Sequence, residues 1–189
     1  MAVILKPTKP VTDEELLELA RINPGYQVER DVRGELIVTP TGGDSARREA
    51  RLIRRLDAWA ERDGGGVAFS STALFFLPDG SRLMPDASWL RNERWRALSS
   101  EERRGFVPAC PDVVFEIRSA GQLPGDLRQK MHAFLANGAT LGVLIDPEVR
   151  IVEIYRHGRE AQLLTDPKTV ALDPELPGFT LDLDPIFAA

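Results

Sequence analysis

The positions from Asp112 to Arg118 alternate between two chemically different faces, which is the pattern of a β-strand. One face is wholly apolar, whereas the other carries two carboxylates and a guanidinium. Such charges are costly on so apolar and β-branched a segment unless they are paired or bind a metal. The alternative is a half-buried edge strand whose polar face meets water. The apolar face holds Val113, Phe115 and Ile117, and the mixed face holds Asp112, Val114, Glu116 and Arg118.

The spacing of apolar residues from Asp44 to about Arg62 predicts an amphipathic helix. Glu49 stands out, because it lies three and four positions before Leu52 and Ile53, near the centre of the apolar stripe. A lone carboxylate at that position needs a partner. Alternatively, the first turn projects beyond the core and leaves Glu49 solvated or paired with a nearby arginine. The stripe consists of Leu52, Ile53, Leu56, Trp59 and Ala60.

A second amphipathic helix is predicted from Asp126 to Ala136, where Asn137-Gly138 supplies a C-terminal cap. Lys130 lies at the margin of its apolar stripe, so the ammonium can turn back over the apolar face. The alternative is that only the aliphatic stem of Lys130 lies on the protein and its charge stays in water. The stripe consists of Leu127, Met131, Phe134 and Leu135.

The segment between these two helices contains a predicted hairpin, with arms from Val67 to Leu77 and from Arg82 to Leu90. Pro85 has no backbone N–H and is therefore disfavoured in a central strand. We expect Asp86 to stand where the second arm begins to run inward.

The remaining pattern predicts short elements around this centre. They are a helix from Thr12 to about Arg21 opened by a Thr12/Glu15 capping box, a hairpin of Tyr26–Arg30 and Glu35–Thr39, a surface helical excursion from Asn92 to Gly105, a strand from Leu141 to Ile145 with Ile151–Tyr155 as its antiparallel neighbour, and covering strands and turns to the C-terminus.

Composition limits the function classes. The 189 residues, of which 43% are hydrophobic, predict one domain over residues 1–189 with a proper core. The net charge of -5 argues against a module that coats nucleic acid non-specifically, and only weakly against a nuclease. Cys110 is the sole cysteine, so neither an internal disulfide nor a cysteine-based zinc site is expected. No apolar run approaches a signal peptide or membrane span, so we expect a cytoplasmic protein with no membrane partner.

The order of these elements resembles the αβββαβ core of the PD-(D/E)XK nuclease superfamily. Pro85-Asp86 is similar to its PD, Glu116-Ile117-Arg118 is similar to its (D/E)-x-K, and Glu49 stands where many members place a helix glutamate. The resemblance implies a restriction-endonuclease-like fold of the α/β (α+β) class. It implies a mixed central β-sheet flanked by helices, with an N-terminal hairpin and C-terminal covering strands added.

Longer strings resemble the Uma-two branch of that superfamily, a group of bacterial restriction-endonuclease-like proteins, over a core of about residues 30 to 160. The strings are Thr39-Pro40-Thr41-Gly42-Gly43, Pro85-Asp86-Ala87-Ser88-Trp89, Pro111 to Ser119, Lys130 with Phe134, and Asn137-Gly138-Ala139 before Leu144-Ile145-Asp146-Pro147.

The resemblance implies an endonuclease that uses Mg²⁺ or Mn²⁺ to hydrolyse phosphodiester bonds of DNA. Asp86 and Glu116 are the implied metal ligands, completed by the main-chain carbonyl of Ile117, with Glu49 holding the metal or its water. The motif lysine is Arg118 here, and arginine does not deprotonate in proteins. Either Arg118 acts purely by charge, or Lys130 supplies the cation.

Asp112 shares the strand face of Glu116 but lies roughly 13 Å along it at ~3.3 Å per residue, so we expect Asp112 to support the strand end.

Analogy with the superfamily also suggests a homodimer, because a symmetric pair can cut both strands of a duplex. The competing hypothesis is a catalytically degenerate module that keeps the nuclease fold and binds nucleic acid or a protein partner. Arg118 and the acidic balance favour that alternative, whereas the survival of Glu49, Asp86, Glu116 and Lys130 opposes it.

Overall fold

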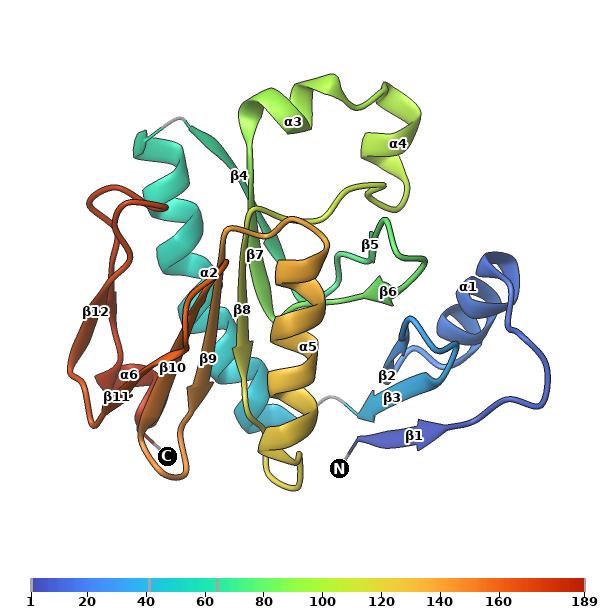
Figure 1. The fold of residues 1–189 in the computed structure, drawn as a ribbon, viewed down its shortest axis with the longest axis horizontal. Helices are drawn as coiled ribbons and strands as arrows, with labels where there is room; N and C mark the ends of the chain where they lie inside the picture. Colours follow the sequence, from blue (N-terminus) through green and yellow to red (C-terminus); the bar gives the residue numbers. More distant parts are fainter. Residues whose placement is uncertain (1, 41, 64, 189) are drawn as a thin grey trace.

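A six-stranded sheet forms the centre of the computed structural model, which describes residues 2–40, 42–63 and 65–188 (Figure 1). Strand β8 lies inside this sheet, antiparallel to β7 and parallel to β9. All five residues of β8 are buried, so the edge-strand alternative is wrong. In spatial order the strands are β11 (Gln162–Thr165), β10 (Ile151–Arg156), β9 (Leu141–Asp146), β8 (Val113–Ile117), β7 (Ala87–Arg91) and β4 (Gly66–Ser70).

Two helices cover opposite faces of this sheet. Helix α2 (Gly43–Asp63) buries Leu56 and Trp59 against the face that carries Phe115. Helix α5 (Pro124–Ala136) connects β8 to β9 and buries Met131 in the cluster that contains Val114. Both faces of β8 are therefore withdrawn from water, which explains why four of its five residues are apolar and Glu116 is the single polar one.

A second, five-stranded sheet is built mainly from the N-terminal segment and carries α1 (Asp13–Ile22). Thr12 and Glu15 form the predicted capping box, and Leu16 packs on Val28 and Leu36. The sheet contains the predicted hairpin of β2 and β3, joined by a strand that the sequence pattern did not indicate, β1. In spatial order it contains β1 (Val3–Leu5), β3 (Leu36–Pro40), β2 (Tyr26–Arg30), β6 (Arg82–Leu83) and β5 (Phe75–Phe76).

The hairpin predicted between Val67 and Leu90 is divided between the two sheets. Its outer residues pair as β4 and β7 in the large sheet, whereas its inner residues pair as β5 and β6 in the small one. The division falls at Met84-Pro85-Asp86, the place where Pro85 was expected to interrupt the strand. Residues 84–86 therefore cross from one sheet to the other.

The remaining elements cover the outside of the large sheet. The excursion after β7 forms two short helices, α3 (Asn92–Ala97) and α4 (Ser100–Arg104). The C-terminal segment forms β12 (Thr169–Ala171), β13 (Thr180–Asp182) and α6 (Asp184–Phe187), and its Phe179 packs edge-on against Trp59 at 5.7 Å between ring centroids. Within the described ranges, no helix combines the length and apolar character needed to cross a membrane.

Candidate active site

Asp86 and Glu116 lie side by side on neighbouring strands. Ala87 pairs with Phe115 in the antiparallel β7–β8 ladder, and Asp86 and Glu116 are the next residues outward from that pair. The Asp86 carboxylate is anchored to the partner strand, because its Oδ2 accepts a hydrogen bond from the Ile117 main-chain N–H at 2.6 Å. Two sequence segments predicted to carry metal ligands are thus brought together at one end of the sheet.

Lys130 reaches this pair from α5. Its Nζ lies 2.8 Å from Glu116 Oε1 and 2.9 Å from Glu29 Oε1, and it donates to the Met84 carbonyl at 2.8 Å. Three oxygens thus surround a group with three N–H donors. Only 11% of the Lys130 side chain is exposed, so the alternative in which its charge stays in water is wrong. Lys130 is the cation that contacts Glu116, one of the predicted carboxylates.

Glu29 is the member of this cluster that sequence reasoning missed. It lies on β2 in the small sheet, is 2% exposed, and accepts a hydrogen bond from the Met84 N–H at 2.6 Å. The strand pattern gave no signal for it, because Glu29 alternates with Val28 and is expected on the wet face of an isolated hairpin. Only the packing of the small sheet against α5 buries it.

The carboxylates of the cluster perturb one another. Burial, followed by the nearby charge of Glu49, raises the pKa of Asp86 to about 7, although Lys130 opposes the shift. Burial also raises the pKa of Glu116 well above its usual range, again against the effect of Lys130. Burial would lower the pKa of Lys130, but the charges of Glu116, Glu29 and Asp86 together outweigh it and raise that pKa.

Glu49 completes the acidic side of the cluster from the first turns of α2. Its side chain is half-buried, and it forms no ion pair within 4.0 Å with another described residue. It is near enough to Asp86 for its charge to affect that carboxyl. The alternative in which Glu49 pairs with a nearby arginine is therefore not what the structure shows: the first-turn arginines Arg47 and Arg48 pair with Asp44 instead.

Arg118 is directed away from the cluster. Its Nε lies 2.6 Å from Asp146 Oδ2 and its Nη2 lies 2.6 Å from Glu148 Oε2, so both ends of the guanidinium are engaged with carboxylates that follow β9. Both ion pairs raise the pKa of Arg118, partly offset by burial. Of the two cations that the sequence offered, Lys130 contacts Glu116 and Arg118 does not.

Asp112 has the supporting position expected of it at the opposite end of β8. It is 3% exposed, accepts a hydrogen bond from the Arg91 N–H at 2.9 Å, and forms ion pairs with the side chains of Arg91 and Arg94. Its carboxylate fastens the end of β7 to the start of β8.

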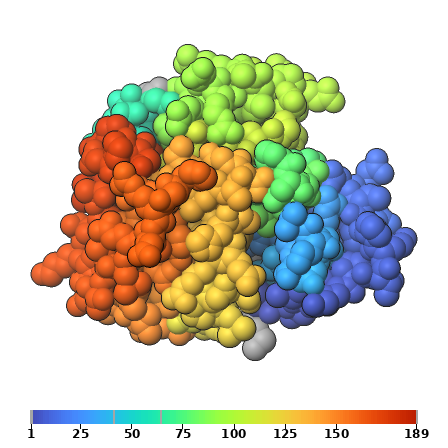
Figure 2. Space-filling view, in the orientation of Figure 1, coloured from blue at the N-terminus to red at the C-terminus, as the bar shows by residue number. Residues whose placement is uncertain are grey.

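A groove leads to the cluster between the small sheet and α5. One cavity of about 370 Å³ is lined by Glu29, Lys130 and apolar residues, and a second of about 400 Å³ is lined by Arg48 and Ser119. Ala2, Thr39 and Gln122 line both cavities, which makes them parts of one groove. In the space-filling view the blue N-terminal residues lie beside the yellow residues of α5 (Figure 2).

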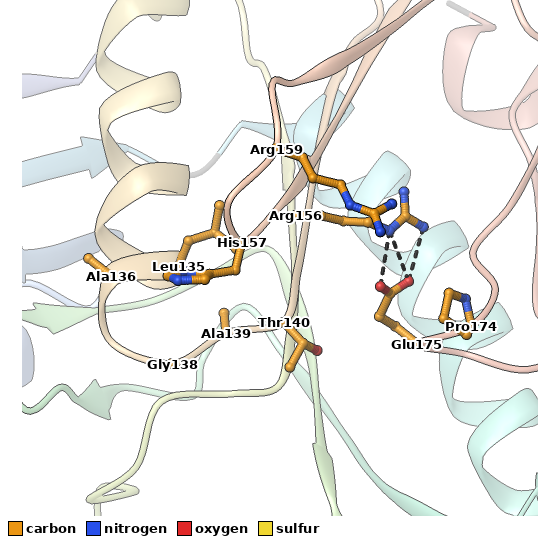
Figure 3. Close-up of a pocket in the computed structure, with 10 residues that line it drawn as sticks. All are labelled: Leu135, Ala136, Gly138, Ala139, Thr140, Arg156, His157, Arg159, Pro174 and Glu175. Atoms are coloured by element: carbon orange, nitrogen blue, oxygen red, sulfur yellow. Dashed lines mark hydrogen bonds and ion pairs between the residues drawn. The ribbon is translucent and has the colours of Figure 1, made fainter.

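A larger hollow of about 520 Å³ lies at the other end of α5 (Figure 3). Its wall includes Thr140, whose N–H donates to the Asp112 carbonyl at the far end of β8 from Glu116. Its Arg156 is already held by Glu175 at 3.0 Å. The hollow therefore shares no residue with the carboxylate cluster, and its most buried cation is neutralised.

The cluster has the donor chemistry of a Mg²⁺ or Mn²⁺ site. Over the described residues, no group of three acidic, histidine or cysteine side chains is close enough to hold a metal by itself. Mg²⁺ does not require one, because it is typically bound by one or two carboxylates, with water and substrate phosphate completing its shell. Glu116 Oε1 is buried without a well-aligned hydrogen bond, although the Lys130 ammonium is close to it. The carboxylates of Asp86 and Glu116 therefore fit the ion, and the Ile117 N–H holds Asp86 beside Glu116.

The sequence of residues 13–184 matches the family model Uma2, described as "Putative restriction endonuclease". The chain belongs to the Uma2 family. This confirms the resemblance to the Uma-two branch that the strings around Asp86 and Glu116 indicated.

One solved structure shares the fold of this chain over nearly its whole length. The crystal structure of a "putative nuclease" from Anabaena variabilis aligns with a TM-score of 0.77 and 22% sequence identity, covering 94% of this chain and 98% of that one. This likeness confirms the restriction-endonuclease-like fold. A DrdV–DNA complex aligns with 62% of this chain and 10% of that one, at 18% identity and a TM-score of 0.40. No curated protein matches the sequence. The family supports a nuclease-type function for this Uma2 chain.

Proposed function

We propose that this Uma2 protein is a divalent-metal-dependent endonuclease that hydrolyses phosphodiester bonds of DNA. The observation that carries the proposal is the contact between Lys130 Nζ and Glu116 Oε1 at 2.8 Å, beside an Asp86 that is anchored to the same strand. Two carboxylates and one ammonium at a groove are the groups that metal-assisted phosphodiester hydrolysis requires. The family membership supports the same chemistry.

Each residue has a distinct role in this proposal. Asp86 and Glu116 would bind the ion with their carboxylate oxygens, and Glu49 would hold a water of its shell. A bound Mg²⁺ or Mn²⁺ would supply Lewis-acid activation of the phosphate and a water of lowered pKa. Lys130 keeps a positive charge at the site, and its ammonium would donate hydrogen bonds to the phosphate oxygens as negative charge develops on them. Arg118 stays in its ion pairs with Asp146 and Glu148.

Substitution of the two proposed ligands tests the function. Asp86→Ala and Glu116→Ala should each abolish cleavage of plasmid and linear DNA in millimolar Mg²⁺ or Mn²⁺. Asp112→Asn is the matched control, because Asp112 is a buried acid of the same strand region that supports β7 and lies away from Lys130. Cleavage at the wild-type rate by either alanine variant would refute the assignment. A parallel assay on RNA of the same sequence defines the substrate.

A second candidate is a non-catalytic module that binds nucleic acid or a protein partner. The observation in its favour is that Lys130 and Arg118 are each shared between two carboxylates, so neither cation is free for a phosphate in this conformation. Calorimetric titration with Mn²⁺ separates the two candidates. Saturable binding that Glu116→Ala removes supports the nuclease, whereas no binding at millimolar Mn²⁺ supports the module.

We also propose that the nuclease acts as a homodimer, since paired active sites can cut both strands of a duplex. Light scattering at the protein concentration of the cleavage assay measures this directly. A monomer mass together with double-strand cleavage would reject the dimer and leave the nuclease assignment intact.

A further inference from the structure

Glu29 connects the two sheets at the proposed active site. It comes from β2 in the small sheet, whereas Asp86, Glu116 and Lys130 belong to the large sheet and its helix. The motif residues that the sequence displays do not include it. A carboxylate that is 2% exposed is costly unless its negative charge is paired and hydrogen-bonded, so its partners define what it does.

Those partners form a closed ring. Glu29 Oε1 accepts from the Met84 N–H at 2.6 Å and lies 2.9 Å from Lys130 Nζ, while Lys130 Nζ donates to the Met84 carbonyl at 2.8 Å. Met84 is two residues before Asp86, in the segment that crosses between the sheets. One carboxylate thus holds both the ammonium and the main chain that leads to the first proposed metal ligand.

The three N–H groups of the Lys130 ammonium face three oxygens, and only one of these belongs to a proposed metal ligand. Glu29 and the Met84 carbonyl have no other proposed role, but Glu116 is a proposed metal ligand whose carboxylate cannot serve the ammonium and a metal equally well. If Glu116 turned to a bound metal, Glu29 and the Met84 carbonyl would still hold the ammonium, and its third N–H would be available. That N–H is the one that can turn to a phosphate oxygen of the substrate.

We propose that Glu29 is a positioning residue that keeps the Lys130 ammonium at the site when Glu116 is engaged by a metal ion. The proposal rests on the function proposed above and extends it to a residue of the N-terminal sheet. Without Glu29, the ammonium has only Glu116 and one neutral carbonyl, and it competes with the metal for Glu116. Loss of Glu29 therefore impairs the catalytic step more than DNA binding.

The variant Glu29→Gln separates this role from simple support of the fold. The glutamine carbonyl oxygen can still accept from the Met84 N–H, whereas the negative charge next to Lys130 is lost. Glu153→Gln is the matched control, because Glu153 is also a buried acid at 7% exposure, lies two strands from Glu116, and is held by Arg128 and the Tyr155 hydroxyl and not by Lys130. Glu29→Asp keeps the charge but withdraws it by one methylene, and is the second variant if the glutamine variant does not fold.

The readout is the ¹⁵N-detected ammonium signal of Lys130 in the full chain, with and without Mg²⁺. We expect slow hydrogen exchange at this ammonium in the wild type and in Glu153→Gln, persisting when Mg²⁺ is added. In Glu29→Gln, exchange should be at least about 10-fold faster, corresponding to about 1.4 kcal/mol, and the signal should be lost in Mg²⁺. Glu29→Asp should lie between them. Wild-type exchange in a folded Glu29→Gln, or in Glu29→Asp if only that variant folds, would overturn the proposal.

Cleavage kinetics give a second, separable test. We expect Glu29→Gln to lower kcat at least about 10-fold with the KM for DNA changed less than about threefold. An unchanged kcat in a cleaving enzyme refutes the role of Glu29 and leaves the nuclease assignment standing. If the wild type cleaves no DNA, the nuclease assignment fails, and the Mg²⁺ response of the Lys130 signal still decides whether Glu29 holds the ammonium.

Discussion

The carboxylate of Asp86 accepts a hydrogen bond from the main-chain N–H of Ile117 at 2.6 Å, across the boundary between β7 and β8. This contact places the aspartate of one motif beside the glutamate of the other, because Ile117 directly follows Glu116. Burial is the largest reason that the pKa of Asp86 is raised to about 7, and the hydrogen bond from Ile117 opposes that shift. If Asp86 and Glu116 bind a metal as proposed, their buried carboxylates cost the protein stability when the metal is absent.

Asp86→Asn should therefore stabilise the metal-free protein while removing its response to metal. The asparagine carbonyl can still accept from Ile117, and the cost of a buried negative charge near Glu49 disappears. We expect a free energy of unfolding higher by about 1 kcal/mol without metal, and no stabilisation by Mn²⁺. In the wild type, Mn²⁺ at about 100 times its Kd should add about 2.7 kcal/mol. Thermal unfolding with and without Mn²⁺ measures both, and a wild-type Mn²⁺ shift in the variant would contradict the assignment of Asp86 as a ligand.

The stability of the metal-free protein should fall as pH rises from about 5 to 8. Burial raises the pKa of Asp86 to about 7 and that of Glu116 well above its usual range, so the folded state holds protons that the unfolded state has already released. Their contribution is complete below the unfolded pKa values and is lost as pH passes the folded ones. We expect a decrease of at least about 1 kcal/mol in urea titrations. The double variant Asp86→Asn/Glu116→Gln should flatten this slope, and an equal slope in the variant would assign it to other groups.

Arg118 and Lys130 should give opposite phenotypes. Arg118→Gln removes ion pairs to Asp146 and Glu148 at 2.6 Å, so the free energy of unfolding should fall by about 2 kcal/mol while cleavage persists. Lys130→Gln removes the ammonium beside Glu116 and should lower kcat by at least about 100-fold. Steady-state cleavage and urea unfolding of the two variants give the comparison. Loss of cleavage in a folded Arg118→Gln would restore Arg118 as the motif cation.

Asp112→Ala should reduce stability without changing metal affinity. The substitution leaves the partly buried Arg91 N–H without its acceptor and breaks the ion pairs to Arg91 and Arg94. A loss of about 3 kcal/mol is expected from these contacts. Mn²⁺ affinity measured by calorimetry should stay within about twofold of the wild type, because Asp112 and Glu116 lie at opposite ends of β8. A large loss of Mn²⁺ affinity in the folded variant would place Asp112 in the metal site.

The helices other than α6 could be predicted from sequence because local chemistry determines them, whereas the spatial order of the strands depends on tertiary contacts. The Thr12/Glu15 capping box forms as expected, and the apolar stripe of α2 is buried through Leu52, Leu56 and Trp59. The short strand β1 was missed, since its three residues, Val3–Leu5, are exposed and carry no alternation. The split of the hairpin between two sheets was missed as well, because its division depends on which neighbours each half meets in space.

The sequence predicted part of the site: it indicated Asp86 and Glu116, but it missed Glu29 and left the identity of the cation open. Asp86 and Glu116 could be placed on adjacent strand ends from motif order, but Arg118 was given a choice of roles because its partners, Asp146 and Glu148, follow another strand. The parallel register of β8 and β9 sets those partners beside it, and no local pattern encodes that register. Glu29 was absent from the predicted site for the same reason, since only tertiary packing turns it toward Lys130.

The crossing at residues 84–86 connects Asp86 to both sheets. Asp86 directly precedes β7 of the large sheet, and its carboxylate accepts a hydrogen bond from Ile117 in that sheet. Met84, two residues earlier, is hydrogen-bonded through its main chain to Glu29 and Lys130. Pro85, between Met84 and Asp86, has a fixed φ angle, which limits backbone rotation in this short segment. A shift of the N-terminal sheet would therefore move the Lys130 ammonium and the main chain before Asp86 together.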